Sequence, residues 1–322
     1  MRTVKPNFYD NFRCIAEKCT DNCCIGWEVD VDCDTAEKYA AYRGALGERL
    51  RSELTVSDDG SRCFKMRADG RCPFLNENNL CDIIAEAGDG MICEICREHP
   101  RFYEWAADVT ECGLGLCCEE ACRLLLNCGE FSLAVDGDEE AEDDEAEIYD
   151  SFFAFRENLI NIISNGKEDF SKCIENVLAA VESSEFYCGE DRTLKTAKEI
   201  AELYKTTEPI DGNWVAYAEK IAAYAENGAG FNKADEPWLR LVFEYLLYRH
   251  LTAGLYDGDI YARACFCAEA AGYIALCADV KRTENGVLCE RDIIDVIKYW
   301  SKQTEYSDLN INKAITSLGT EN

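Results

Sequence analysis

Residues 14–24 read CIAEKCTDNCC, which places four cysteines within eleven positions. The crowding continues along the chain: 15 of the 21 cysteines lie between residues 14 and 128, and the other six lie between residues 173 and 289. Thiols crowded in this way form disulfides, bind zinc or bind an iron–sulfur cluster. The structure and chemistry of the N-terminal part therefore depend on which of these three applies.

The redox state of the compartment in which the protein lies distinguishes disulfides from the two kinds of metal site. The opening sequence MRTVKPNFYDNFR lacks an apolar core of signal-peptide length, because Asp10 and Arg13 interrupt the only candidate stretch. We therefore expect a cytoplasmic protein, whose thiols stay reduced. A chain of 322 residues can also bury an ordinary hydrophobic core without covalent cross-links. Both points favour metal binding over disulfides.

The composition limits the partners. The chain has 63 acidic and 33 basic residues and a formal charge of −30, which repels phosphate backbones, so we expect neither nucleic acid nor an anionic membrane as partner. A lysine-bearing protein would be attracted, although solvated acidic helix faces are the commoner reason for such charge. No uninterrupted apolar stretch approaches the roughly 20 residues that span a bilayer. Even residues 266–280 contain Glu269 and Asp279.

An acidic stretch divides the chain. Residues 136–147 read DGDEEAEDDEAE, with nine carboxylates in twelve positions, and predict a linker between a cysteine-rich metal-binding domain at 1–135 and a second domain at 148–322. Within the first domain, residues 63–67 and 71–75 flank Ala68, Asp69 and Gly70, which predicts a small β-hairpin. Residues 76–79 predict a second turn.

The second domain has helical periodicity, so the fold class is mainly α. Between Pro237, a start signal, and Gly254, a stop signal, apolar residues recur at helical spacing. Similar patterns cover residues 148–164, 168–183, 192–206, 213–227, 259–281 and 288–303. The cysteines of this domain mostly occupy positions of small core residues, so we expect them to pack rather than bind metal. They are Cys173, Cys188, Cys265, Cys267, Cys277 and Cys289.

The first domain supplies the candidate metal ligands. An iron–sulfur cluster needs thiolates from several loops, and tight spacings combined with distant returns provide them. Adjacent cysteines point apart on an extended strand, so Cys23 and Cys24 are expected to have different roles. His99 and His250 are the only histidines, which makes a zinc site rich in histidine improbable, and His250 is expected to be a helix residue. The candidates are Cys14-x4-Cys19-x3-Cys23-Cys24, Cys72-x8-Cys81, Cys93-x2-Cys96, Cys117-Cys118 and Cys122.

At these residues the chain resembles the flagellin lysine-N-methylase (FliB) family and, more distantly, cysteine-motif proteins that chelate iron or zinc. The resemblance follows the same order along nearly the whole chain, with weaker likeness at residues 245–248 and 302–310. The matching stretches are Phe12-Arg13-Cys14 through Cys19, Cys23-Cys24 with Gly26-Trp27, Cys72-Pro73-Phe74 with Leu80-Cys81, Cys96-Arg97 with Pro100-Arg101, and residues 116–126 around Cys118.

The resemblance implies an enzyme that uses S-adenosylmethionine and a [4Fe–4S] cluster to methylate lysine side chains of flagellin. Eight matching cysteines exceed the four that one cluster takes, so either two metal centres exist or some of the eight support the fold. The implied ligands are Cys14, Cys19, Cys23, Cys24, Cys72, Cys81, Cys96 and Cys118.

The chain also departs from the family pattern. Radical chemistry is not supported, because the Cys-x3-Cys-x2-Cys triad is missing: after Cys19 and Cys23 the next thiol follows immediately, at Cys24. Additional cysteines could replace some ligands of the family. They are Cys33, Cys63, Cys93, Cys112, Cys117, Cys122 and Cys128.

Lysine methylation requires the neutral amine, so a base must remove a proton, and the sequence does not identify that base. The chain also lacks the glycine-rich strand-to-helix turn of Rossmann-like methyltransferases. The resemblance suggests that an open iron site anchors the amino and carboxylate groups of the donor. Arg97 and Arg101 either offset the negative charge of a thiolate-bound cluster or pair with neighbouring glutamates, and Trp27 either stacks on the adenine of the donor or packs.

A second class of function stays open. Because the sequence locates neither the donor site nor the base, the chain could also be a non-catalytic cysteine-rich protein that binds iron or zinc.

Overall fold

The computed structural model describes residues 2–57, 60–137, 144–189, 192–226 and 232–316. It divides the chain into two compact units. The helical unit consists of Met1–Phe12, Tyr103–Cys117 and Ala121–Asn322, and the cysteine unit consists of Arg13–Phe102 and Cys118–Glu120.

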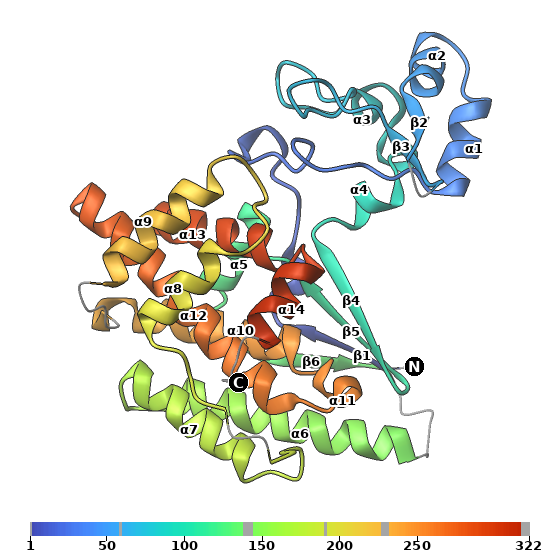
Figure 1. Cartoon of the computed structure of the whole chain (residues 1–322). Helices are drawn as coiled ribbons and strands as arrows, with labels where there is room; N and C mark the ends of the chain where they lie inside the picture. The colour runs from blue at the N-terminus through green and yellow to red at the C-terminus, as the bar shows by residue number, and fades with distance from the viewer. Residues whose placement is uncertain (1, 58–59, 138–143, 190–191, 227–231, 317–322) are drawn as a thin grey trace. The chain divides into compact units, whose positions relative to one another are not determined.

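The fold is mainly α, as the periodicity predicts (Figure 1). Each predicted window of the helical unit holds one helix; α11 (Gly254–Asp257) and α14 (Asp308–Thr316) were not predicted, and α5 (Glu119–Leu126) precedes these windows. The predicted helices are α6 (Asp144–Asn165), α7 (Phe170–Glu182), α8 (Ala197–Lys205), α9 (Trp214–Ala225), α10 (Glu236–His250), α12 (Ile260–Asn285) and α13 (Glu290–Thr304).

Helix α12 is the centre of the helical unit. Its alanine-rich sequence lets α7, α8, α9, α10, α13 and α14 all pack against it. The helix is long and apolar enough to cross a membrane, but 89% of its most apolar window is buried inside the protein. A helix that is apolar on all sides belongs in a protein core or in a bilayer, and this burial is that of a core helix.

Most cysteines of the helical domain pack as predicted. Cys173, Cys265, Cys267 and Cys277 are buried. Cys188 and Cys289 are exposed instead, and each makes a polar contact. The Cys188 thiol donates to the carbonyl oxygen of Gly258 at 2.7 Å, and Cys289 begins α13 with its thiol 3.0 Å from an Asp292 carboxylate oxygen.

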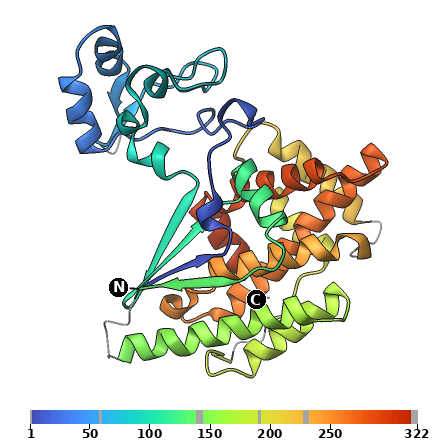
Figure 2. The same ribbon diagram turned by 180° about the vertical axis from the view of Figure 1, so that it is seen from behind.

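The helical unit also contains a small sheet that the sequence did not predict. Its strands are β1 (Arg2–Pro6), β4 (Arg101–Ala106), β5 (Val109–Leu114) and β6 (Leu133–Asp136), in the order β4-β5-β1-β6. Strand β1 pairs in parallel with β5 and antiparallel with β6. The strands fan out from the end that carries the N-terminus (Figure 2).

The structure distributes the chain differently from the expected division at 136–147. Three strands that precede this stretch lie in the helical unit, because α10 holds the sheet: the Tyr248 hydroxyl donates to the carbonyl oxygens of Val4 at 3.0 Å and Cys112 at 2.8 Å. Strand β6 ends at Asp136 and α6 begins at Asp144. Most of the predicted linker, residues 138–143, lies outside the described residues.

The cysteine unit consists of short elements: η2 (Ala16–Lys18), α1 (Cys33–Ala41), α2 (Ala45–Ser52), β2 (Leu54–Val56), β3 (Arg62–Phe64), α3 (Asp82–Ala87), η3 (Asp89–Met91) and α4 (Glu94–Glu98). A two-stranded sheet is present, but the predicted pairing is wrong, because β3 pairs with β2 instead of with residues 71–75. The Asp69-Gly70 turn does form: the Gly70 N–H donates to the Arg67 carbonyl oxygen at 2.8 Å, with a φ of +75° that favours glycine.

Candidate metal centre

All eight cysteines that the resemblance implies as ligands lie in the cysteine unit. Cys118 is included although it is distant in sequence, because Cys118–Glu120 belongs to this unit. Of the additional cysteines, Cys33, Cys63 and Cys93 lie in the same unit, whereas Cys112, Cys117, Cys122 and Cys128 lie in the helical unit. No disulfide joins the cysteines that the structure describes.

Backbone hydrogen bonds bring the first three thiol-bearing segments together. The Cys72 N–H donates to the Cys24 carbonyl oxygen at 2.8 Å, next to a β-bridge between Ile25 and Arg71. A second bridge joins Leu75 to Cys81, because the turn at residues 76–79 returns the chain onto itself. The predicted turns therefore place Cys24, Cys72 and Cys81 on adjoining segments.

The fourth segment is α4, which begins after Cys93. Asp32 fixes this segment, since one carboxylate oxygen caps α1 through the Thr35 N–H at 2.8 Å and the other accepts the Glu94 N–H at 2.9 Å. Cys96 lies one turn after Cys93, on the same side of the short helix. The Tyr39 hydroxyl donates to the Met91 carbonyl oxygen at 2.8 Å and lies 3.5 Å from the Cys93 sulfur.

Six thiols interact electrostatically on these segments, and we call them the thiol cluster. Cys23 hydrogen-bonds to Cys24, and Cys93 hydrogen-bonds to Cys96. The two pairs also interact electrostatically with each other and with two further thiols, and each interaction is repulsive when the sulfur atoms are charged. The thiol cluster consists of Cys23, Cys24, Cys72, Cys81, Cys93 and Cys96.

Burial and mutual repulsion keep most of these thiols protonated. Hydrogen bonding within each pair, followed by burial, raises the pKa of Cys24 and of Cys96 far above the usual thiol value. Burial also raises the pKa of Cys72 to about 11. The exception is Cys93, where the hydrogen bond with Cys96 outweighs burial and lowers the pKa. A bound cation would lower these pKa values and favour the thiolate, because thiolate is the form that ligates metal.

The residues fit a thiolate-bound metal by donor type and by position. Four segments each present one or two sulfur atoms beside a common apolar core that includes Tyr39, Phe64 and Phe74. In the parts of the chain that the structure describes, no three Cys, His, Asp or Glu side chains already have the spacing of a metal site. The observation that supports a metal is therefore the convergence of six sulfur donors, not a closed coordination geometry.

The remaining three predicted ligands are Cys14, Cys19 and Cys118. The Cys19 thiol donates to the Asp21 carbonyl oxygen at 3.2 Å and lies 3.7 Å from a carboxylate oxygen of Glu119. The same oxygen accepts the N–H of Thr20 at 2.9 Å and its hydroxyl at 2.8 Å. Because Glu119 follows Cys118, these bonds bring the Cys19 and Cys118 segments together. Cys14 is exposed.

The other predicted site residues have more ordinary surroundings. The Arg97 guanidinium lies 3.6 Å from a Glu98 carboxylate oxygen, as the pairing alternative predicts, and Arg101 donates to the Arg97 carbonyl oxygen at 3.4 Å. Trp27 is half-buried. His250 is a buried residue of α10 that hydrogen-bonds to Glu305 at 3.0 Å, which confirms that it is a helix residue. The roles of Arg97, Arg101 and Trp27 towards a cofactor stay predictions.

The resemblance did not include Cys93 among the implied ligands, but its spacing had made it a candidate, and the structure places it within the thiol cluster. The Cys-x2-Cys spacing with Cys96 was the signal, because a spacing of three residues puts both thiols on one side of a helical turn. The contact with Tyr39 had no sequence signal, since its partner is 54 positions away.

Comparison with known proteins adds independent evidence. A segment of 129 residues, 38% of this chain, is 27% identical to the flagellar biosynthetic protein FliU of Salmonella muenchen and covers 76% of it. The chain is similar to lysine-N-methylases. Those of Salmonella choleraesuis and Salmonella typhimurium are each 26% identical over 129 residues, which is 32% of their length. These matches confirm the resemblance to the FliB-like family.

The similarity is partial. The match spans about a third of the length of these lysine-N-methylases, and most of the present chain lies outside it. No family model matches the chain, and no solved structure matches it.

Proposed function

We propose that this chain is an S-adenosylmethionine-dependent protein-lysine N-methyltransferase that acts on flagellin in the cytoplasm and holds a [4Fe–4S] cluster. The observation that carries the proposal is the convergence of six thiols in the cysteine unit, in a chain similar to proteins named for lysine methylation and flagellar biosynthesis. One [4Fe–4S] cluster takes four thiolates, so the six thiols supply enough ligands in number.

The reaction assigns defined tasks to the protein. The neutral amine of the substrate lysine attacks the methyl carbon, the carbon–sulfur bond breaks, and the donor leaves as a neutral thioether. The lysine must first lose a proton, because its ordinary pKa is about 10.4. The protein must therefore hold the amine away from water and accept that proton. When bound, the cluster would be held by cysteines of the thiol cluster and would supply thiolate-bound iron to the cysteine unit.

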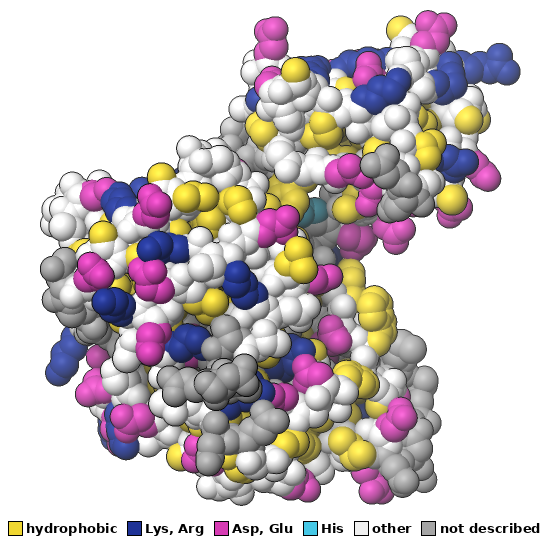
Figure 3. All heavy atoms as spheres, viewed as in Figure 1, with side chains coloured by type: hydrophobic (Ala, Val, Ile, Leu, Met, Phe, Trp, Pro, Cys, Tyr) yellow, Lys and Arg dark blue, Asp and Glu magenta, His cyan; other side chains and the backbone are white. Residues whose placement is uncertain are grey.

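The surface charge supports a lysine-bearing substrate. The chain has a formal charge of −30. On the face of the helical unit seen in Figure 3, Asp and Glu side chains are spread over many elements and interspersed with Lys and Arg. Such a distribution attracts a cationic partner at long range without marking one docking patch.

The test is to purify the full chain without oxygen, measure iron and sulfide, and incubate it with labelled donor and flagellin. We expect thiolate-bound iron with broad absorption near ~400 nm and labelled methyl groups on flagellin lysines. The Cys72→Ser protein is the matched control and should lose both. An iron-loaded protein that transfers no methyl groups would contradict the proposed reaction.

A non-catalytic cysteine-rich protein that binds iron or zinc is the second candidate. It is favoured by the partial match, which leaves about two thirds of the lysine-N-methylases without a counterpart here. Under this alternative the anaerobic protein holds stoichiometric metal and is inert towards flagellin. If that metal is zinc, the protein is colourless.

A further inference from the structure

A cavity of about 330 Å³ lies in the helical unit, between α7, α8 and α12. Its walls are mostly apolar, with Ile174 from α7, Ile200 from α8 and Leu276 from α12. Small-molecule sites are typically concave and apolar with a few polar groups that fix orientation. This cavity belongs to neither the thiol cluster nor the Cys19 and Cys118 segments.

Lys195 and Glu269 are two of the polar residues that line the cavity. The Lys195 ammonium nitrogen is buried and has no hydrogen-bond partner among the described residues, although it lies 3.5 Å from a Glu269 carboxylate oxygen. Glu269 is only 4% exposed, and its other carboxylate oxygen accepts the Lys195 N–H at 2.9 Å. The ion pair with Glu269 compensates the charge of the buried ammonium group but leaves its hydrogen-bonding capacity unused, so this position can receive an anionic ligand group.

The other charged residues of the cavity are already paired. Glu175 accepts a hydrogen bond from Lys172 at 2.7 Å, and Asp279 forms an ion pair with Arg282. The positive group with unused hydrogen-bonding capacity is therefore Lys195, and the carboxylate nearest to it is Glu269.

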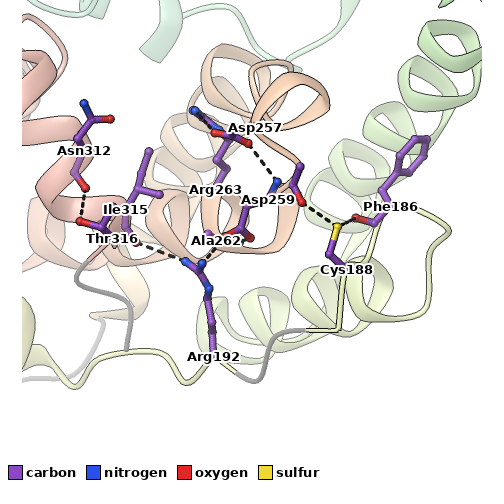
Figure 4. Close-up of polar contacts among 11 residues, drawn as sticks. Phe186, Cys188, Arg192, Asp257, Asp259, Ala262, Arg263, Asn312, Ile315 and Thr316 are labelled. Carbon is purple, nitrogen blue, oxygen red and sulfur yellow. Dashed lines mark hydrogen bonds and ion pairs between the residues drawn. The ribbon is translucent and has the colours of Figure 1, made fainter. Parts of the chain in front are cut away.

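The segment that presents Lys195 is fixed in place. Arg192 forms an ion pair with Asp259, at the start of α12, and donates to the Ile315 carbonyl oxygen at 3.5 Å (Figure 4). Three residues later the Lys195 backbone N–H binds Glu269. Because the segment is held at both points, the backbone of Lys195 is positioned at the cavity before any ligand arrives, which reduces the entropy lost on binding.

We propose that this cavity binds the α-amino carboxylate end of a small molecule with an apolar or thioether body, with its carboxylate on Lys195 and its ammonium on Glu269. The choice of ligand rests on the proposed function, since the methyl donor carries such an end. A free amino acid such as methionine presents the same chemistry, so the experiment must separate the two sources.

The test is calorimetric titration of the full chain with S-adenosylhomocysteine, with methionine and with methylthioadenosine, which lacks the amino-acid end. We expect S-adenosylhomocysteine to bind at least 10-fold more tightly than methylthioadenosine. Lys195→Met should weaken that binding at least 10-fold. Lys198→Met is the matched control, because Lys198 lies three residues on, is exposed and pairs with Glu226, and it should bind as the unmodified protein does.

A second variant keeps the inference testable if Lys195→Met does not fold. Ala197→Leu fills the cavity from the start of α8, retains Lys195 and should also weaken binding. Equal affinity for methylthioadenosine, or unchanged affinity in the Lys195→Met and Ala197→Leu proteins, would overturn the site. Methionine binding as tightly as S-adenosylhomocysteine would identify a free amino acid as the ligand.

This result is separable from the proposed function. Binding that depends on Lys195 without any methyl transfer would keep the site and overturn the methyltransferase. Methyl transfer that is unchanged in Lys195→Met, with unchanged affinity for S-adenosylhomocysteine, would keep the methyltransferase and overturn the site.

Discussion

At the scale of single residues, the thiol cluster separates two kinds of cysteine. Cys72, Cys81 and Cys96 lie on turns or on a short helix, beside other thiols. Cys265 lies inside α12, fully buried, where burial raises its pKa to about 12. We expect serine at any of the first three to lower the iron content of the anaerobic protein, because losing one thiolate exposes the metal to water and oxidation.

Cys265→Ser is the matched control. Serine there buries a hydroxyl and should destabilise the protein by about 1–3 kcal/mol without changing the iron content. Metal analysis and urea unfolding of both sets of proteins measure the two effects. Equal loss of iron from Cys265→Ser and Cys72→Ser would show that the metal is not held by the cysteine unit.

Glu244 of α10 gives a residue-scale prediction on pH. The side chain is 2% exposed, and burial raises its pKa to about 7, although a hydrogen bond from Ser164 opposes the shift. Between its ordinary pKa and about 7, the folded protein holds a proton that the unfolded chain has lost. The stabilisation from this group is therefore complete at low pH and is lost as the pH rises to about 7.

Glu244→Gln should remove this pH dependence, since glutamine still accepts the Ser164 hydrogen bond and never ionises. At pH 8 we expect the variant to be more stable than the unmodified protein by about 1–3 kcal/mol, and at pH 4.5 the difference should vanish. Urea unfolding at both pH values measures it. Glu157→Gln, on the exposed face of α6, should show no such difference, and a pH-independent effect of Glu244→Gln would refute the argument.

At the scale of elements, the long helices were predictable from sequence and the sheet was not. Helix α10 shows why the prediction succeeded, because Pro237 and a repeating apolar face fix its start and its buried side locally. Strand β1 shows the opposite case. It is five residues long, alternates buried and half-buried residues, and pairs Arg2 with Val109, more than a hundred positions away. No local pattern specifies such a partner.

The candidate metal site, like the fold, was predictable only where local sequence signals specify it. The spacing of the cysteines and the turn residues around them are local signals, and they pointed to Cys72, Cys81 and Cys96. The apolar core beneath the thiols, with Tyr39 and Phe74, depends on packing between distant segments. The division of the chain also depended on such packing, because Tyr248 binds strands that precede the acidic stretch.

The start of α12 gives an element-scale prediction. An Asp259 carboxylate oxygen accepts the Ala262 N–H at 2.9 Å, which caps the helix, and the carboxylate also forms an ion pair with Arg192. Asp259→Ala removes both interactions and should destabilise the helical unit by about 0.5–2 kcal/mol from the cap alone. Asp259→Asn keeps a capping side chain, so thermal unfolding should show a smaller loss. Equal losses in both variants would contradict the capping role.

At the scale of the whole chain, the helical unit is assembled from segments far apart in sequence around one buried ion pair. Arg156 of α6 is fully buried and donates two hydrogen bonds to the carboxylate of Glu111, which lies on β5. Thr252 donates its hydroxyl to the same carboxylate at 2.7 Å. Burial alone would raise the pKa of Glu111, but Arg156 together with the hydrogen bonds from Tyr149 and Thr252 outweighs burial and lowers that pKa. The carboxylate is therefore charged and depends on its partner.

Removing one partner of this pair should have a large effect. Arg156→Met leaves the Glu111 carboxylate buried and uncompensated, and we expect a loss of about 3–5 kcal/mol in the free energy of unfolding. The double variant Arg156→Met with Glu111→Gln should be more stable than Arg156→Met alone, because glutamine is neutral and still accepts the hydroxyl of Thr252. Urea unfolding of the full chain measures the difference.

The exposed pair of Lys172 and Glu175 provides the matched comparison. Its two side chains are 53% and 63% exposed, so solvent screens the pair and Lys172→Met should leave the free energy of unfolding nearly unchanged. The decisive comparison is whether Glu111→Gln raises or lowers the free energy of unfolding of the Arg156→Met protein. If Glu111→Gln fails to recover stability in the Arg156→Met background, the cost comes from a cavity and not from an unpaired charge. In that case the pair joins the sheet to α6 by shape alone, and replacing both residues with apolar ones of similar volume would preserve the fold.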